Sequence, residues 1–331
     1  MRPGCKQARI DAFVSRESKL PRMESDGRLT VVELFAGAGG MALGLEQAGF
    51  RHIALVERDA ECVATLRANG FRSVLCCDAA IEDYSRFQGA DLVAGGPPCQ
   101  PFSIEGKSEG RHDARDGWSA AIRAVREVKP RAFVFENVMG MMRDQFEEYR
   151  NCILRDFYDM GYCVHMHVVD AAHYGVAQHR KRLFMTGFRG VHWFAKPTPE
   201  ENQVTVQQAL QTLGPPNGVN GHELHGALAR PYGTKTGSSL DKPSRTLVAG
   251  SGHPGGGTNM LRQSDGFHRY YTLREMARLQ SFPDTFKVHK TWSRAMHQMG
   301  NACPPKLARV FGQSIHAVLS DDGALASDVH R

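Results

Sequence analysis

A buried strand that leads directly into a glycine-rich turn constrains this chain more than any other feature. Residues 29–34 form an apolar run, and residues 41–48 have the spacing of a helix with one apolar face. Three glycines, Gly37, Gly39 and Gly40, lie in the turn between them. We expect further strands at residues 52–56, 74–75, 92–94, 132–135, 163–169 and 183–188, and helices at residues 60–69, 118–128 and 145–158. This alternation predicts an α/β fold with an open, mainly parallel, doubly wound sheet.

The pattern changes near residue 189. The stretch to about residue 266 is rich in Gly, Pro, Ser, Thr and His and has few clear elements, which is typical of a small second domain built largely of loops. Regular patterns resume at residues 273–279, and a last helix is expected at residues 306–319.

Composition excludes several classes of protein. The hydrophobic share of 41% and the charged share of 23% are ordinary for a soluble globular protein. Because no apolar run approaches the roughly 18 residues that span a bilayer, we expect no membrane segment. The eight cysteines include no C-x-x-C pair, so we expect neither a disulfide framework nor a metal site, but an intracellular protein. The net charge of +6 is compatible with a polyanionic partner.

The glycine turn is a candidate nucleotide site. Residues 37–42 fit the loose pattern G-x-G-x-x-[G/A], and Glu57 follows Gly37 by 20 positions, at the end of the second expected strand. An acid there accepts hydrogen bonds from ribose hydroxyls. The motif alone equally fits a dinucleotide, S-adenosylmethionine or a tight packing turn. Phe35, which would pack on the ligand, and Asp78, which would accept from an adenine amino group, favour S-adenosylmethionine.

A cysteine follows the strand at residues 92–94, between a double proline and a further Gln-Pro. Cysteine is nucleophilic only as thiolate, and a rigid turn presents the sulfur of Cys99 at a fixed point. Glu136 ends the next strand, and Arg180 and Arg182 precede the strand at residues 183–188. Each has a simpler interpretation: a buried cysteine, a helix cap, a solvated basic face. Since active sites of such sheets lie at the carboxyl ends of strands, we expect thiol, carboxylate and guanidinium groups to converge.

The sequence resembles the DNA (cytosine-5)-methyltransferases of the single-module prokaryotic type, from about residue 31 to residue 308. The matching blocks are residues 35–40 (FAGAGG, the donor loop), 96–103 (GPPCQPFS, the nucleophile motif), 136–138 (ENV, the acid motif), 178–182 (QHRKR, the arginine motif), 274–283 and 300–305.

The resemblance implies methyl transfer from S-adenosylmethionine to carbon 5 of a flipped cytosine in a specific double-stranded DNA sequence. The Cys99 thiolate would add to carbon 6, and Glu136 would bind ring nitrogen 3 and the exocyclic amine. Arg182 would hold the ring carbonyl oxygen, with Arg180 supporting the site. Because the target atom is inaccessible in a duplex, the base must leave the stack.

The resemblance also implies a Rossmann-like methyltransferase fold with a small, loop-rich target-recognition domain. We expect a flexible tail at residues 1–28, a catalytic S-adenosylmethionine-binding domain at residues 29–188 plus 268–320, the target-recognition domain at residues 189–267 and a flexible tail at residues 321–331. The expected donor-binding residues are Phe35, Gly37, Gly39, Gly40, Glu57, Arg58, Asp78, Pro97 and Asn301. Arg58 stands where the family often has an aromatic ring, and its planar guanidinium would stack similarly on adenine.

Double-stranded DNA is the expected partner. The expected contact residues are Gln100, Ser103, Arg115, Arg230, Lys235, Lys242 and Arg245, of which the basic ones mostly bind phosphate. In the N-terminal tail, residues 7–14 (QARIDAFV) resemble a sliding-clamp-binding peptide from Gln7 to Phe13, although an unstructured tail explains them as well. We expect a monomer in the cytoplasm of a prokaryote, associated with the nucleoid.

Two other functions remain open at this stage. One branch of the family methylates transfer RNA, but its Cys-Phe-Thr signature is absent here. A catalytically silent DNA-binding regulator is the other, although Cys99, Glu136 and Arg182 are all retained.

Overall fold

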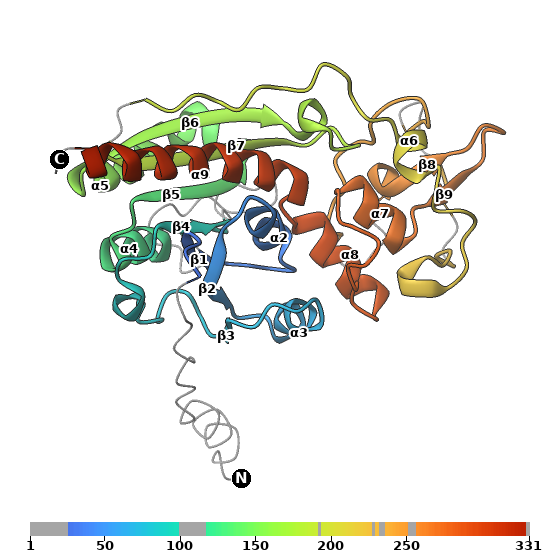
Figure 1. The fold of residues 1–331 in the computed structure, drawn as a ribbon. Helices are drawn as coiled ribbons and strands as arrows, with labels where there is room; N and C mark the ends of the chain where they lie inside the picture. The colour runs from blue at the N-terminus through green and yellow to red at the C-terminus, as the bar shows by residue number, and fades with distance from the viewer. Residues whose placement is uncertain are drawn as a thin grey trace, which may run out of the picture.

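A seven-stranded sheet forms the centre of the larger part of the molecule (Figure 1). The computed structural model describes residues 26–98, 117–190, 193–226, 229–231, 236–250 and 256–328. The strand order is β3-β2-β1-β4-β5-β7-β6. Within this described sheet, β7 runs antiparallel to β5 and β6, and the other six strands run in one direction. The strands are β1 (Thr30–Leu34), β2 (Arg51–Glu57), β3 (Val74–Cys76), β4 (Leu92–Gly95), β5 (Ala132–Val138), β6 (Tyr162–Asp170) and β7 (Lys181–Arg189).

Helices cover both faces of the sheet, so its central strands are mostly apolar. Successive residues of a strand point to opposite faces. Val31 accordingly packs with α2 (Gly40–Gln47) and α9 (Pro305–Asp328), whereas Val32 packs with α4 (Trp118–Val128). α5 (Glu147–Asp159) covers the same face as α4, and α3 (Ala60–Ala68) packs on Leu55 of β2. The expected doubly wound arrangement is therefore present.

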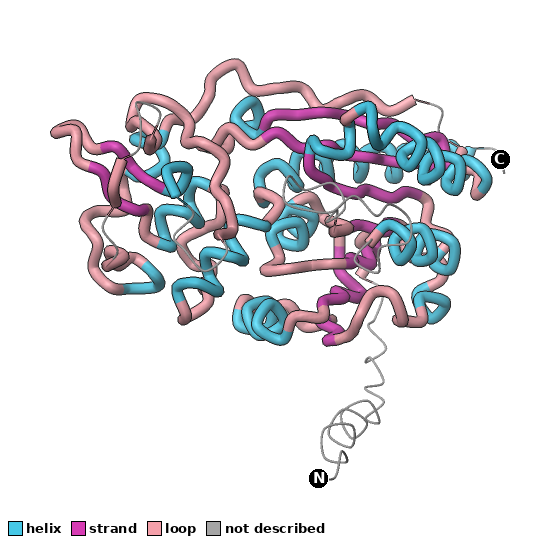
Figure 2. Tube along the Cα trace, turned by 180° about the vertical axis from the view of Figure 1, so that it is seen from behind, coloured by secondary structure: helices cyan, strands magenta, loops and turns pink. Residues whose placement is uncertain are grey.

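The residues after β7 form a smaller region of short elements and long loops (Figure 2). Its elements are α6 (Val206–Leu210), β8 (Met260–Arg262), β9 (His268–Tyr270), α7 (Leu273–Leu279) and α8 (Trp292–Asn301). They share an apolar cluster that includes Leu247, Leu261 and Met276. Short 3-10 helices occur at Tyr84–Phe87, Met139–Met142, Asp144–Phe146, Ala171–Tyr174, Val219–Gly221 and Gly256–Asn259.

The chain returns to the sheet with α9. Leu307 and Phe311 of this helix pack with Leu45 of α2 and Phe184 of β7, so the C-terminal segment completes the core of the first face. The backbone of α9 stays helical to Asp328, beyond the end expected near residue 319. The expected domain boundaries remain predictions.

Gly44 allows α2 and α9 to approach closely. A Cβ atom at Gly44 would lie 2.4 Å from the Pro305 carbonyl oxygen and 2.6 Å from the Ala308 Cβ. The backbones of the two helices cannot both keep their places if a methyl group is added there.

We predict that Gly44→Ala lowers the free energy of unfolding by about 1–3 kcal/mol, because overpacking exceeds the roughly 1 kcal/mol gain in helix propensity. Urea denaturation measures the change. Gly226→Ala is the control, since its Cβ would meet no atom within 4 Å, and we expect a change within about 0.5 kcal/mol. Equal losses in both variants would contradict this account of the helix contact.

Candidate active site

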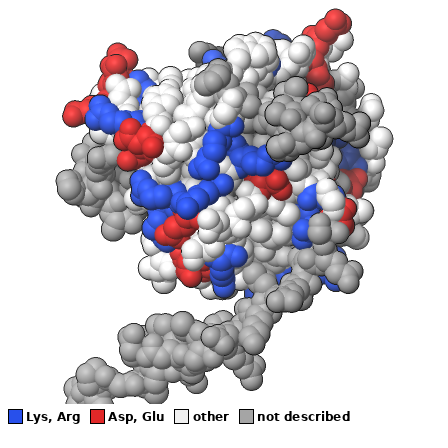
Figure 3. Space-filling view, turned by 60° about the vertical axis from the view of Figure 1, so that its left-hand side comes forward, with Lys and Arg blue, Asp and Glu red and all other residues white. Residues whose placement is uncertain are grey.

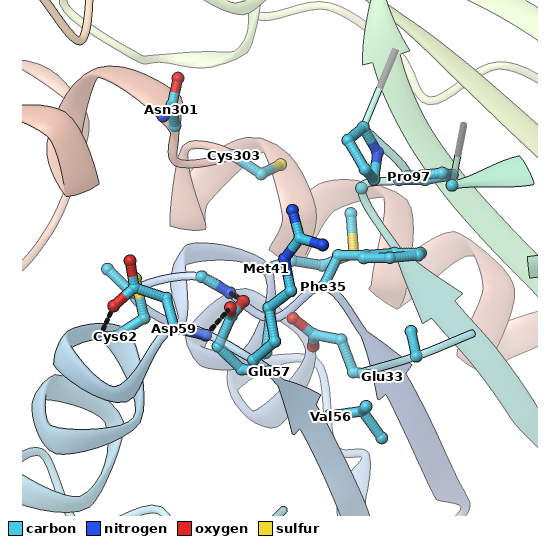
Figure 4. A pocket seen from close by; sticks show the side chains of 18 of the residues that line it. Glu33, Phe35, Met41, Val56, Glu57, Asp59, Cys62, Pro97, Asn301 and Cys303 are labelled. Carbon is cyan, nitrogen blue, oxygen red and sulfur yellow. Dashed lines mark hydrogen bonds between the residues drawn. The ribbon is translucent and has the colours of Figure 1, made fainter. Parts of the chain in front are cut away.

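A cavity of about 530 Å³ opens at the carboxyl ends of β1, β2, β4 and β5 (Figure 4). Segments far apart in the sequence form its walls. Phe35 and Gly37 follow β1, Glu57 ends β2, and Glu136 lies in β5. Asn301 and Cys303, at the end of α8 and after it, close the cavity from the opposite side.

The Glu57 carboxylate holds the glycine turn in place at the β2 side of the cavity. Its Oε2 accepts a hydrogen bond of 2.8 Å from the Gly37 backbone N–H, and its Oε1 accepts one of 2.8 Å from the Asp59 N–H. Asp59 in turn caps α3 by accepting from Glu61 N and Cys62 N. Because a carboxylate oxygen accepts more than one hydrogen bond, Glu57 is fixed in place and still has acceptor capacity for a ligand.

The glycine turn makes a close approach to the C-terminal segment. A Cβ at Gly40 would lie 2.1 Å from the Cys303 carbonyl oxygen. Gly39 has a positive φ of 91° and packs against Leu66 and Phe71, where its Cβ would lie 2.7 Å from a Leu66 methyl carbon. Gly40 therefore lines the cavity, and Gly39 supports it from behind.

Two charged side chains face each other at the open rim of the cavity. The Arg58 Nη1 lies 3.6 Å from the Asp78 Oδ2, and the two side chains are 70% and 44% exposed. Such an exposed pair contributes little to stability, so both groups are available to a ligand. Asp78 also accepts a hydrogen bond from the Ala80 N–H, which orients its carboxylate.

The acid and one arginine of the expected catalytic set form an ion pair. Glu136 of β5 and Arg182 of β7 are brought together by antiparallel pairing, and the Arg182 Nε lies 2.7 Å from the Glu136 Oε1. The contact is an ion pair rather than an aligned hydrogen bond, because the Glu136 Oε1 has no hydrogen-bond partner. Asn137 donates to the Pro97 carbonyl oxygen at 3.1 Å. The end of β5 thereby anchors the proline turn after β4.

Arg180 occupies a different environment from Arg182. It is 1% exposed, and its two terminal nitrogens donate to the carbonyl oxygens of Leu247 (3.2 Å) and Gly300 (2.9 Å). Burial lowers the pKa of the Arg180 guanidinium to about 9. Arg180 thus connects β7, the smaller region and the end of α8, directly before Asn301.

Several predicted residues lie outside the described residues: Cys99, Gln100, Ser103, Arg115 and Lys235, together with the tail segment Gln7–Phe13. Arg230, Lys242 and Arg245 are exposed in the smaller region. On the face toward α4 and α5, basic and acidic side chains lie next to one another (Figure 3). The pairs Arg86–Glu82 and Arg123–Glu127 show the same mixing of charge.

The residues that line the cavity but were not predicted from the sequence include Glu33, Gln298 and Cys303. Gln298 of α8 is 4% exposed and accepts from the Thr65 hydroxyl, while its Nε2 has no hydrogen-bond partner. Glu33 carried a readable signal, because it is a charged residue within the apolar strand β1. Across the described residues, no three His, Cys, Asp or Glu side chains are grouped so as to hold a metal ion. None of the described helices is long and apolar enough for a bilayer.

Comparison with known proteins identifies the relatives of this chain. The family model of the C-5 cytosine-specific DNA methylases matches residues 29–223 and 232–317. The type II methyltransferase M.NgoMIV of Neisseria gonorrhoeae is 34% identical over 315 residues, covering 89% of this chain and 99% of the relative. M.PspPI of Psychrobacter is 34% identical over 346 residues, covering 90% and 81%. The solved structure of S. pombe Dnmt2 superimposes with a TM-score of 0.68 at 18% identity, covering 89% and 99%, and confirms the expected fold.

We predict that Arg180→Met lowers the free energy of unfolding by about 3–5 kcal/mol, because the Leu247 and Gly300 carbonyls lose their buried donor. Chemical denaturation measures the loss. Arg180→Lys, which keeps a donor, is expected to lose less. Arg126→Met on the exposed surface of α4 is the control. If Arg180→Met were as stable as Arg126→Met, the three-way connection would contribute nothing.

Proposed function

The chain belongs to the C-5 cytosine-specific DNA methylase family and is a DNA (cytosine-5-)-methyltransferase, and on this premise we propose how its residues perform the reaction. One observation carries the proposal. A single cavity connects the glycine turn and Glu57 with Glu136, which is ion-paired to Arg182. A methyl donor bound at one end of the cavity therefore meets a cytosine bound at the other end.

The donor is S-adenosylmethionine in this proposal, which supplies a methyl group on a positively charged sulfur. Glu57 accepts the ribose hydroxyls, and Asp78 accepts from the adenine amino group. Phe35 and Pro97 provide apolar walls, and Arg58 stacks on the adenine. The buried, unpartnered Nε2 of Gln298 lines the same cavity and offers a donor to the ligand. The cavity volume is within the range of small-molecule sites.

The end of the cavity at Glu136 activates the cytosine. Carbon 5 of cytosine is too weak a nucleophile by itself. The Cys99 thiolate forms a bond to carbon 6, which places the electron pair of the 5,6 double bond on carbon 5. Glu136 stabilises a proton at ring nitrogen 3, and Arg182 holds the ring carbonyl oxygen. After methylation, a base removes the proton on carbon 5, and the Cys99 thiolate leaves as the 5,6 double bond forms again.

The geometry of the described residues supports these roles. Asn137 fixes the turn that precedes Cys99, through the Pro97 carbonyl. Arg182 keeps the Glu136 carboxylate in one orientation at the cavity wall. Arg180 supports the site indirectly, because it binds the carbonyl directly before Asn301.

DNA is the substrate, and we propose that it is double-stranded, with the target cytosine flipped into this site. Arg230, Lys242 and Arg245 of the smaller region contact phosphates, which fix position without reading sequence. Gln100, Ser103, Arg115 and Lys235 join them in the proposal. The enzyme acts as a monomer in the cytoplasm of a prokaryote, as a modification enzyme like its type II relatives.

We predict that Cys99→Ser reduces methyl transfer by at least about 100-fold while donor binding persists, because a hydroxyl adds poorly to carbon 6. Transfer of a radiolabelled methyl group to DNA from a methylation-free host measures activity. Wild-type protein should form a covalent adduct on a 5-fluorocytosine duplex, and Cys99→Ser should not. Cys152→Ser on α5 is the control.

Three outcomes would contradict this reading. Full activity of Cys99→Ser would exclude the thiolate mechanism. Methylation of transfer RNA in preference to DNA would identify an RNA enzyme instead. Sequence-specific DNA binding without an adduct by the wild type would indicate a silent regulator.

We predict that Glu57→Gln weakens S-adenosylmethionine binding by about 10- to 100-fold, because bonds to a charged acceptor contribute about 1.5–3 kcal/mol. Isothermal titration calorimetry measures the dissociation constant. Glu148→Gln in the exposed first turn of α5 is the matched control. Wild-type affinity in Glu57→Gln would place the donor elsewhere.

A further inference from the structure

A charged pair lies beneath the cavity and takes no part in the steps described above. Glu33 of β1 and His52 of β2 are only 1% and 5% exposed, and the His52 Nε2 lies 2.9 Å from the Glu33 Oε2. Glu33 also lines the cavity, at the side opposite Asn301 and Cys303 (Figure 4). A buried charge is costly, so such a pair in a strand core calls for a physical reason.

The groups around the pair come from α2 and from two loop segments. Glu46 of α2 faces the other side of the imidazole, with its Oε1 3.7 Å from the His52 Nδ1. The backbone N–H of Ala42, in the first turn of α2, bonds to the Glu33 carboxylate. The Phe71 ring contacts the imidazole edge-on, and the buried Cys303 thiol lies within electrostatic reach of Glu33. Histidine thus lies between two carboxylates, one buried and one partly exposed.

These contacts determine the charge states. Burial alone would lower the pKa of His52, but its hydrogen bond to Glu33 and the nearby Glu46 carboxylate outweigh burial and raise that pKa to about 9. Burial raises the pKa of Glu33, while the His52 bond and the Ala42 N–H oppose the rise. At neutral pH His52 is a cation, and its charge favours the anionic form of Glu33 over the protonated form. Without His52, the buried Glu33 would take up a proton more readily.

The geometry links this charge to the donor loop. Ala42 lies two residues after the turn Gly37–Gly40, in the first turn of α2, so the Glu33 carboxylate supports this turn through the Ala42 N–H. A negative charge at this place also complements the positive end of the helix dipole. The same carboxylate faces the cavity, in which the proposed ligand carries two cationic groups, the sulfonium and the ammonium.

We propose that His52 is a positioning residue for the methyl donor: by pairing with Glu33, it keeps a fixed negative charge under the cavity and holds the donor loop in its binding shape. The inference rests on the proposed donor site and extends it to a strand residue that touches no ligand. If His52 had only a structural role, its replacement would lower thermal stability but would change neither the preference for the charged ligand nor the pH dependence of binding.

The test is donor binding by the full-length chain, measured by isothermal titration calorimetry between pH 6 and 9.5. The ligands are S-adenosylmethionine and its neutral-sulfur analogue S-adenosylhomocysteine. The variant is His52→Gln, which keeps a polar group and removes the charge. We expect S-adenosylmethionine to bind about tenfold more weakly to the variant at pH 7, as for the loss of one charge-assisted bond. S-adenosylhomocysteine, with one positive charge fewer, should lose less affinity.

The pH profile provides a second readout. In the wild type, affinity should change little from pH 6 to about 9, because His52 keeps its proton there and stays paired with Glu33. In His52→Gln, affinity should be lowest at pH 6 and improve as pH rises and the unpaired Glu33 ionises. The difference between the two profiles is decisive, because the ligand's own amino group titrates in both.

Further variants separate pairing from packing. His52→Lys restores a cation and should recover affinity toward the wild-type value. Glu33→Gln should resemble His52→Gln, and the double variant should be no weaker than either single one, since both remove the same interaction. His165→Gln on β6 is the matched control, because burial lowers the pKa of that histidine and leaves it neutral above pH 7. It should bind both ligands like the wild type.

The outcomes distinguish two failures. If His52→Gln binds both ligands with wild-type affinities and pH profile, and loses only thermal stability, the inference is wrong and the donor site stands. If the folded wild type binds neither compound, the donor site itself is wrong, and the inference falls with it.

Discussion

The fold depends on the close approach of the first sheet helix to the C-terminal segment. α2 meets this segment twice with no side chain between: Gly40 lies against the Cys303 carbonyl, and Gly44 lies against α9. Either residue could be larger only if one backbone moved. Because the glycine turn starts α2 and Asn301 precedes Cys303, the same approach closes the cavity. The same close approach therefore determines both the packing of one face of the sheet and the formation of the cavity.

Two arginines of one motif differ in role: one lies beside the proposed reacting groups, and the other connects segments of the chain. Arg182 is ion-paired with Glu136 at the cavity wall, whereas Arg180 is enclosed among backbone carbonyls from the smaller region and α8. In the proposed mechanism, the first arrangement leaves the Arg182 charge near the cytosine to be methylated. The second uses the rigid fork of a guanidinium to join three segments that are more than 50 residues apart. Spacing in the sequence does not distinguish these environments.

The sequence predicted the layers of the fold well, because β1, β4 and β5 are apolar runs between glycine turns and amphipathic helices. It also predicted that Glu57, Asp78 and Glu136 lie at the carboxyl ends of strands, where the cavity opens. The direction of β7 could not be read, since periodicity is the same for parallel and antiparallel strands. The pair Glu33–His52 was hidden for a related reason. Its contact depends on the register of β1 with β2, in which His52 pairs with Val31, two residues before Glu33, and a lone histidine in a strand looks like a core residue.

The return of the chain to its own beginning has a consequence for biosynthesis. Domains form from the N-terminus as a polypeptide emerges from the ribosome. Here the sheet strands and Glu57 emerge first, but Gln298, Asn301 and Cys303, which form the opposite wall of the cavity, emerge more than 200 residues later. A nascent chain thus presents half a cleft without its cover. With the donor site proposed above, the capacity to hold a methyl donor arises only after the chain has been synthesised past Cys303, so a shorter nascent chain is inactive.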